Sequence, residues 1–157
     1  MKRSSITVVN LHGSYRLRER RIAAMAAAVL KFLKKPAATR IEIIFLDDRS
    51  MRTLNRRYKR RDRPTDVLSF TIKDRMLGGG GFLGEAFISL DTAARNAKAF
   101  AVPPAEEVLR YVIHAILHIF GYEDYARRDR ARMSRKEEAI LRWLCLREDL
   151  STVLTRR

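Results

Sequence analysis

Apolar residues recur along the chain with two periodicities, one typical of strands and one typical of helices. Short runs rich in β-branched residues predict strands at 5–9, 41–46, 65–72 and 85–90. Apolar side chains repeating every three or four positions predict helices at 16–33, about 51–58, 92–101, 104–120 and 127–146. We therefore expect an α+β fold, a single domain over 1–157 in which a small mixed four-stranded sheet packs against about five helices. The glycines at 78–81 predict a flexible loop, and a frayed tail is expected over about 148–157.

The charge balance narrows the class of partner. The chain has 157 residues, with 33 Lys and Arg against 18 Asp and Glu, a formal net charge of +15. Such an excess favours a phosphate-rich polyanion, because neutralising phosphates releases counterions. A well-solvated basic surface without a specific partner is the alternative.

The sequence gives no sign of a membrane or secretory protein. The longest apolar run, 22–30, is much shorter than the roughly 18–20 residues that a membrane span needs. The first residues lack the apolar core of a signal peptide. A lone cysteine, Cys145, cannot form an internal disulfide and suits a reducing cytoplasm, so we expect a cytoplasmic protein.

Two of the three histidines, His114 and His118, lie four residues apart in the most apolar predicted helix. This spacing places both imidazoles on one face of the helix. Burying two polar rings is costly unless each finds a partner, and a divalent metal satisfies both. A pair of core histidines bonded to carbonyl or carboxylate groups is the alternative, and a bare HxxxH favours it.

The residues that follow change this balance toward a metal. His114 and His118 are followed by Gly121 and Asp124 at the offsets of the zincin-like pattern HExxHxxGxxH. Two imidazoles and one carboxylate leave coordination positions open for water, as in catalytic sites. Ala115 stands where that pattern has its general-base glutamate, so a metallopeptidase is disfavoured and another metal hydrolase remains possible.

Three segments in this order along the chain resemble the motifs of one known family. They are NRRYKRRDRPTDVLSF at 55–70, LGEAFIS at 83–89 and HAILHIFGYED at 114–124. The usual patterns NxxYRxxDxPTDVLSF, LGDIxIS and HGxLHLxGYDH belong to the YbeY family of metal-dependent rRNA-maturation endoribonucleases. Met133, Glu137, Ile140 and Leu141 are similarly spaced to residues of the closing helix of that family. The resemblance extends over most of the chain from Asn55 onward.

The resemblance implies a bacterial cytoplasmic endoribonuclease that prefers single-stranded RNA, with one Zn²⁺ per chain bound by three ligands. It implies a role in maturation of 16S rRNA and in ribosome biogenesis, with precursor small-subunit rRNA, the ribosomal small subunit and assembly factors as partners and no DNA specificity. Five positions depart from the family patterns, namely Lys59 for Arg, Thr71 for Pro, Glu85 for Asp, Ala115 for Gly and Asp124 for His. The carboxylate of Asp124 makes Fe²⁺ and Mn²⁺ rivals of Zn²⁺.

These residues suggest a mechanism of phosphodiester hydrolysis. In this hypothesis His114, His118 and Asp124 hold the metal, and water activated by the metal attacks the phosphorus. Lys59 or Arg60 stabilises the charge that develops on the phosphoryl oxygens. Glu85 or Asp66 could orient the water or a histidine ring, although Asp66 can equally be a turn carboxylate and Glu85 a solvent-facing strand residue.

Basic residues cluster beside these motifs. The candidate RNA-binding residues are Arg56, Arg57, Lys59, Arg60, Arg61 and Arg63 in the first cluster, and Arg127 and Arg128 in the second. Together they predict a basic groove that leads to the metal, although any one of them could lie on a solvated helix face. Tyr125 is the candidate for stacking on an unpaired base. A non-catalytic rRNA-binding assembly factor with a structural metal would explain the same charge, and is the alternative function.

Overall fold

The structure is a computed structural model that describes residues 4–36, 38–73 and 82–157. The main sheet has the strand order β1 (Ser5–Asn10), β3 (Arg40–Leu46), β5 (Phe82–Ser89) and β4 (Val67–Lys73). The first three of these strands are parallel, and β4 runs antiparallel to β5 along one edge. The helices are α1 (Glu19–Phe32), α2 (Asp48–Lys59), α3 (Leu90–Ala99), α4 (Pro104–Ile119) and α5 (Arg127–Cys145). The expected mixed four-stranded sheet and five helices are thus confirmed.

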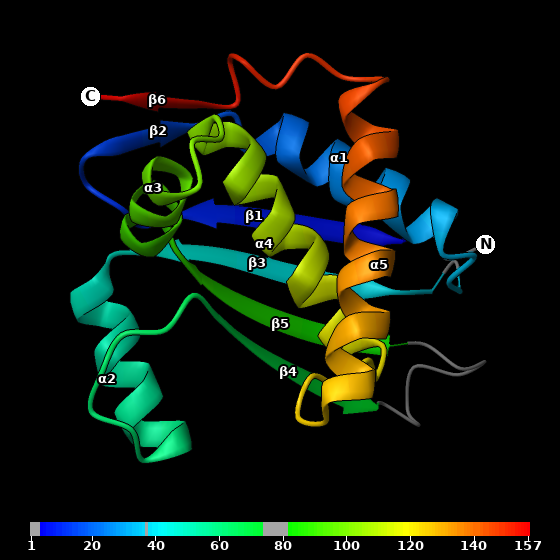
Figure 1. Ribbon diagram of the computed structural model, residues 1–157, viewed down its shortest axis with the longest axis horizontal. Coiled ribbons are helices and arrows are strands. Elements are labelled where there is room, and N and C mark those ends of the chain that lie inside the picture. The colour runs from blue at the N-terminus through cyan, green and yellow to red at the C-terminus, as the bar shows by residue number, and fades with distance from the viewer. Residues whose placement is uncertain (1–3, 37, 74–81) are drawn as a thin grey trace.

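The core lies between one face of the sheet and the helices α1 and α4, with α5 packed on α4 (Figure 1). Side chains alternate along a strand, so Ala86 and Ile88 of β5 face this core while Phe87 faces the other side. On that other side the ring of Phe70 lies 6.1 Å from the ring of Phe87 and 5.1 Å from that of Tyr58 in α2. The two faces of the sheet therefore have different cover, α1 and α4 on one and part of α2 on the other.

Helix α4 lies unusually close to strands β4 and β5. A Cβ atom at Gly84 would be 2.7 Å from Cγ2 of Ile119, so only glycine permits this approach. The hydroxyl of Thr71 donates a hydrogen bond to the carbonyl of Ile119 at 2.9 Å, and the hydroxyl of Ser69 donates one to Ala115 at 3.4 Å. These contacts attach the edge strand to the last two turns of α4, the part of the helix that carries the histidines.

The tail is ordered, contrary to the expected fraying over 148–157. It forms β6 (Leu154–Arg156), which pairs antiparallel with β2 (Tyr15–Leu17). Val153 is fully buried, and its carbonyl accepts a hydrogen bond from the backbone N–H of Arg18 at 3.0 Å. The segment predicted as the start of a helix at 16 is therefore a strand, and α1 begins at Glu19, because the tail offers Tyr15–Leu17 a backbone partner.

The glycine-rich segment 78–81 lies outside the described residues. Within the ranges that the structure covers, none of the helices combines the length and the apolar character that crossing a bilayer requires.

Candidate metal centre

Helix α4 begins and ends at residues that the sequence marks clearly. Pro104 occupies the first turn, where its missing N–H costs nothing, and acidic side chains in the same turn complement the helix dipole. The chain leaves the helix through Gly121, whose φ of 90° favours glycine. The N–H of Gly121 donates to the carbonyl of His118 at 3.0 Å, and the next N–H, from Tyr122, donates to Leu117 at 3.0 Å. This reversal brings Asp124 back toward the helix.

His114, His118 and Asp124 converge as the sequence predicts. The Nε2 atoms of the two histidines are 3.0 Å apart, and Oδ2 of Asp124 lies 3.5 Å from Nε2 of His118 and 3.9 Å from Nε2 of His114. One ligand atom from each residue lies within 4.8 Å of the others. All three side chains are partly exposed, so the cluster is open to solvent on one side.

The hydrogen bond made at Nδ1 of each histidine determines which ring nitrogen carries the proton and which offers a lone pair. The carbonyl of Tyr122 lies 2.9 Å from Nδ1 of His118, and a carbonyl can only accept, so Nδ1 carries the proton. The carboxylate of Glu137 lies 2.8 Å from Nδ1 of His114 and accepts a hydrogen bond in the same way. In the neutral rings both Nε2 atoms are then unprotonated acceptors that face each other and a carboxylate oxygen. Such a donor set fits a divalent cation, because three acceptors that converge without a donor repel one another.

The electrostatic environment differs between the two histidines. Burial tends to lower the pKa of His114, but the hydrogen bond and the negative charge of Glu137 outweigh it and raise this pKa above its usual value. Burial and the neighbouring His114 lower the pKa of His118. His118 is therefore held in the neutral form that can ligate a metal, and His114 is the more basic ligand.

Glu137 is held in place by Arg110. A guanidinium nitrogen of Arg110 lies 3.6 Å from Oε1 of Glu137, another lies 3.5 Å from Oε2 of Glu107, and the same side chain contacts Glu138. Burial raises the pKa of Glu107, which is almost fully enclosed. The sequence predicts neither Arg110 nor Glu137 as a site residue. The only signal for Arg110 is that it is a charged residue within a predicted apolar helix. Glu137 has the same signal and also belongs to the family resemblance.

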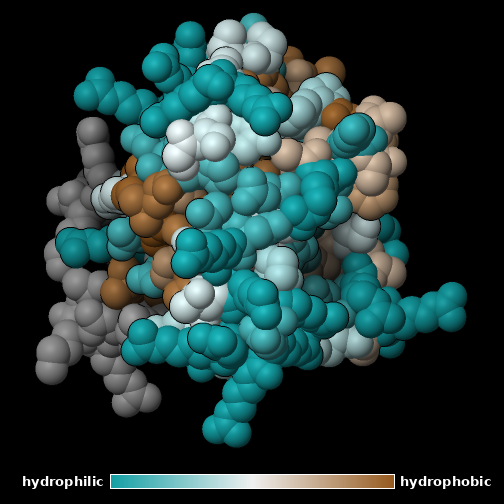
Figure 2. Space-filling view, turned by 90° about the vertical axis from the view of Figure 1, so that its left-hand side faces the viewer, coloured by the Kyte–Doolittle hydropathy of each residue, from teal (hydrophilic) through white to brown (hydrophobic). Residues whose placement is uncertain are grey.

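A pocket of about 500 Å³ opens beside the metal cluster. Of the residues predicted to bind RNA, Lys59, Arg61 and Arg63 line it, together with the stacking candidate Tyr125. The pocket lining does not include the others, which are Arg56, Arg57, Arg60, Arg127 and Arg128. Figure 2 shows that the side of the molecule carrying α2 and α3 is largely hydrophilic.

Lys59, Arg61 and Arg63 reach the pocket from the end of α2 and the turn that follows it. Arg60 takes a left-handed conformation with φ of 54° and ends the helix, so the chain turns at 60–63. Asn55, which is buried, donates a hydrogen bond from Nδ2 to the carbonyl of Arg63 at 2.8 Å. Arg52 forms two hydrogen bonds with Asp62 at 2.8 and 2.9 Å. The turn is thus tied to α2 at two points.

The structure separates the two acids that the sequence offers as orienting groups. Asp66 lines the pocket, where its Oδ1 accepts hydrogen bonds from the N–H of Val67 at 2.7 Å and from the hydroxyl of Thr65 at 3.2 Å. Glu85 lies between Gly84 and Ala86, which face α4, so its side chain is on the opposite face of the sheet. The expectation that Glu85 orients the water or a histidine ring is therefore not supported by its position.

Together the fold and the site define a class: an α+β protein with a His-x3-His helix, a carboxylate as the third candidate ligand, and an adjoining pocket into which three basic residues reach. The model of the family described as Endoribonuclease YbeY matches residues 8–144. The chain belongs to the YbeY family.

The chain covers different shares of the relatives that it matches. The chain is 42% identical to Endoribonuclease YbeY of Anaeromyxobacter dehalogenans over 78% of its length and 63% of that protein. It is 36% identical to the Myxococcus xanthus protein of the same name, over 90% of the chain but 48% of that protein. For Pelotomaculum thermopropionicum the identity is 33%, over 87% of the chain and 94% of that protein. The chain thus spans about half to two thirds of some relatives and nearly all of another.

The fold has a counterpart among solved structures. The solution structure of TM1509 from Thermotoga maritima superposes with a TM-score of 0.58, covering 87% of this chain and 86% of that one. The sequence identity is 22%, so this likeness concerns the fold alone.

Proposed function

We propose that the chain is a metal-dependent endoribonuclease that cleaves single-stranded RNA during maturation of 16S rRNA. The observation that carries the proposal is the convergence of three acceptor atoms, from His114, His118 and Asp124, on the wall of a pocket that Lys59, Arg61 and Arg63 also line. Membership of the YbeY family supports an RNA substrate. Precursor small-subunit rRNA, the ribosomal small subunit and its assembly factors are the proposed partners, in the cytoplasm.

His114, His118 and Asp124 would hold one divalent cation, with Zn²⁺ as the proposed ion and Fe²⁺ or Mn²⁺ as rivals. When bound, such a cation lowers the pKa of a coordinated water and polarises a phosphoryl oxygen. The contribution of Glu137 is to keep the proton of His114 on Nδ1, which leaves Nε2 free as a ligand atom. The carbonyl of Tyr122 does the same for His118.

The basic residues of the pocket would bind the RNA backbone. Lys59, Arg61 and Arg63 carry positive charge into the pocket that contains the ligands, where a phosphodiester would be neutralised as it approaches. Lys59 is the proposed catalytic cation, since it lines the pocket and Arg60 does not. Hydrolysis adds one water across a P–O bond and leaves two RNA fragments. Asp66, which lines the same pocket, is the acid proposed to orient a water.

The test combines metal analysis with cleavage. Wild-type protein purified without chelators should contain about one metal ion per chain, and the His118→Ala variant should contain much less. Wild type should cleave single-stranded precursor 16S rRNA, and EDTA should abolish the cleavage. His114→Ala should lose cleavage but keep RNA affinity, because the basic residues remain.

Other outcomes decide against the proposal. Metal-free wild type, or cleavage that EDTA leaves unchanged, would exclude the metal-dependent mechanism. Metal binding and RNA binding without cleavage would identify the non-catalytic assembly factor. The nucleophile is either water or the RNA 2′-hydroxyl, and a substrate with a 2′-deoxy residue at the cut site distinguishes them. This substrate is still cleaved if water attacks, and it is not cleaved if the 2′-hydroxyl attacks.

A further inference from the structure

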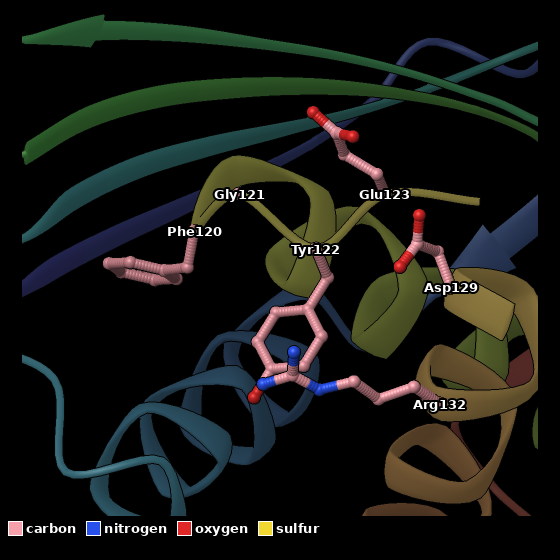
Figure 3. Close-up of a pocket in the computed structure, with 6 residues that line it drawn as sticks. All are labelled: Phe120, Gly121, Tyr122, Glu123, Asp129 and Arg132. Carbon is pink, nitrogen blue, oxygen red and sulfur yellow. The ribbon is translucent and has the colours of Figure 1, made fainter. Parts of the chain in front are cut away.

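A second basic feature lies beyond the metal pocket, across the α4–α5 loop. A hollow of about 240 Å³ adjoins this loop, and it shares Gly121, Tyr122 and Glu123 with the metal pocket. Figure 3 shows the guanidinium of Arg132 lying across the ring of Tyr122, and the distance from its central carbon to the ring centroid is 5.5 Å. The ammonium of Lys35 lies 4.7 Å from the centroid of Phe120. Phe120, Tyr122 and Arg132 line the hollow, together with the carboxylates of Glu123 and Asp129. Two of its aromatic rings thus each have a cation over them.

The same arrangement continues onto α1 and α5, which pack against each other. The ammonium of Lys136 lies 5.6 Å from the centroid of Phe32, and the guanidinium of Arg147 lies 4.7 Å from that of Trp143. The rings of Phe32 and Trp143 are themselves 5.2 Å apart. We call these four ring–cation pairs, from Tyr122 to Trp143, the cation–aromatic strip. Four of the five cation–π contacts found in the described part of the chain belong to it.

The cations of the strip have no carboxylate partner, as is the case for most basic residues of the described chain. Arg21, Arg52, Arg95 and Arg110 all form ion pairs with carboxylates. Among the residues that the structure describes, no carboxylate lies within ion-pair distance of the four cations of the strip. Contact with a ring stabilises an exposed cation by about 0.5–1 kcal/mol and restricts its movement, without neutralising its charge.

We propose that the cation–aromatic strip binds single-stranded RNA that extends from the metal pocket across the α4–α5 loop. Single-stranded nucleic acid is bound by cations that follow the backbone and by aromatic rings or guanidinium planes on which bases stack. The strip holds its cations, two of them guanidinium groups, over half-buried rings. From Arg132 to Trp143 helix α5 rises by about 16 Å, enough for roughly five stacked nucleotides. The inference rests on the proposed function, because the pocket that it extends is the proposed site of cleavage.

Direct binding tests the strip without requiring cleavage. The probe is a fluorescently labelled 20-nucleotide oligouridine, titrated in EDTA at several salt concentrations and followed by anisotropy. The strip variant combines Lys35→Gln, Lys136→Gln and Arg147→Gln. Its control removes the same charge from exposed positions elsewhere on the chain, with Arg20→Gln, Lys98→Gln and Arg156→Gln. Circular dichroism and the thermal midpoint establish that both variants are folded.

The two variants should differ strongly. Losing three phosphate contacts should reduce the slope of log affinity against log salt by about 2, and should weaken binding at 0.1 M salt roughly 10- to 100-fold. The control should stay within about threefold of wild type. Trp143 is the only tryptophan of the chain, so RNA on the strip should also quench the intrinsic fluorescence of wild type.

Equal loss of affinity in both variants would overturn the inference, because it would mean that only net charge matters. Unchanged emission of Trp143 at saturating RNA would overturn it as well, and this measurement depends on no variant. Failure of the proposed function looks different, since it would appear as absent cleavage of precursor 16S rRNA while oligouridine still binds through the strip.

Discussion

Replacing Glu137 by Gln should weaken metal binding without disturbing the fold. The side chain keeps its shape and an oxygen that can accept from Nδ1 of His114, but it loses the negative charge. The hydrogen bond is 2.8 Å long and the carboxylate is only 12% exposed, so water replaces little of the lost interaction. A hydrogen bond to a charged group exceeds a neutral one by about 1–1.5 kcal/mol, which corresponds to about a tenfold loss of metal affinity. Loss of the partner of a metal-binding histidine typically costs about 10- to 100-fold, so the estimate lies at the lower end of that range.

Glu138→Gln is the matched control. Glu138 is the next residue of the same helix, also contacts Arg110, and is 54% exposed, but no hydrogen bond joins it to His114. Competition for Zn²⁺ against a chromophoric chelator at pH 7 would measure both affinities. Arg110 keeps a carboxylate partner in either variant. If Glu137→Gln binds Zn²⁺ within twofold of Glu138→Gln, the charge of Glu137 does not tune the site and the reasoning is wrong.

Three further predictions concern packing, loop position and alkaline stability. Gly84→Ala should destabilise the protein by about 1–3 kcal/mol in urea unfolding, because its Cβ would meet Ile119 at 2.7 Å, and it should cost less than this when introduced into an Ile119→Ala background. Asn55→Ala should weaken oligouridine binding while metal stoichiometry stays the same, because the carbonyl of Arg63 loses its donor; unchanged affinity would contradict this. Burial raises the pKa of Tyr111 to about 12, so ionisation of this side chain should cost the wild type about 2 kcal/mol of stability as the pH rises from 10 to 12. Tyr111→Phe should abolish this loss, as denaturant titrations at several pH values would show.

The sequence predicts the metal helix well because its signals are local. Proline, acidic residues and glycine mark its two ends, and the four-residue spacing of His114 and His118 fixes their common face. Asp124 is placed correctly because Gly121 reverses the chain within three residues of it. The strands of the main sheet are likewise visible as short β-branched runs.

Features that depend on distant contacts could not be predicted in this way. Strand β2 forms only because the tail pairs with it, so nothing within 15–17 distinguishes it from the start of a helix. The sequence leaves Glu85 open as an orienting acid or a solvent-facing strand residue, and the alternation of side chains in β5 turns it away from α4. Glu137 is 23 positions from His114, and its role depends on how α5 packs against α4.

The pairing of β2 with β6 has a consequence for the order in which the protein folds during synthesis. Tyr15–Leu17 emerge early from the ribosome, while their partners Leu154–Arg156 are made near the end of the described chain. Until then Val153 cannot fill its buried position, and the apolar residues that it covers remain accessible to water or to chaperones. A contact between such distant segments also slows folding. The nascent chain should therefore acquire full resistance to proteolysis only after residue 156 has been made.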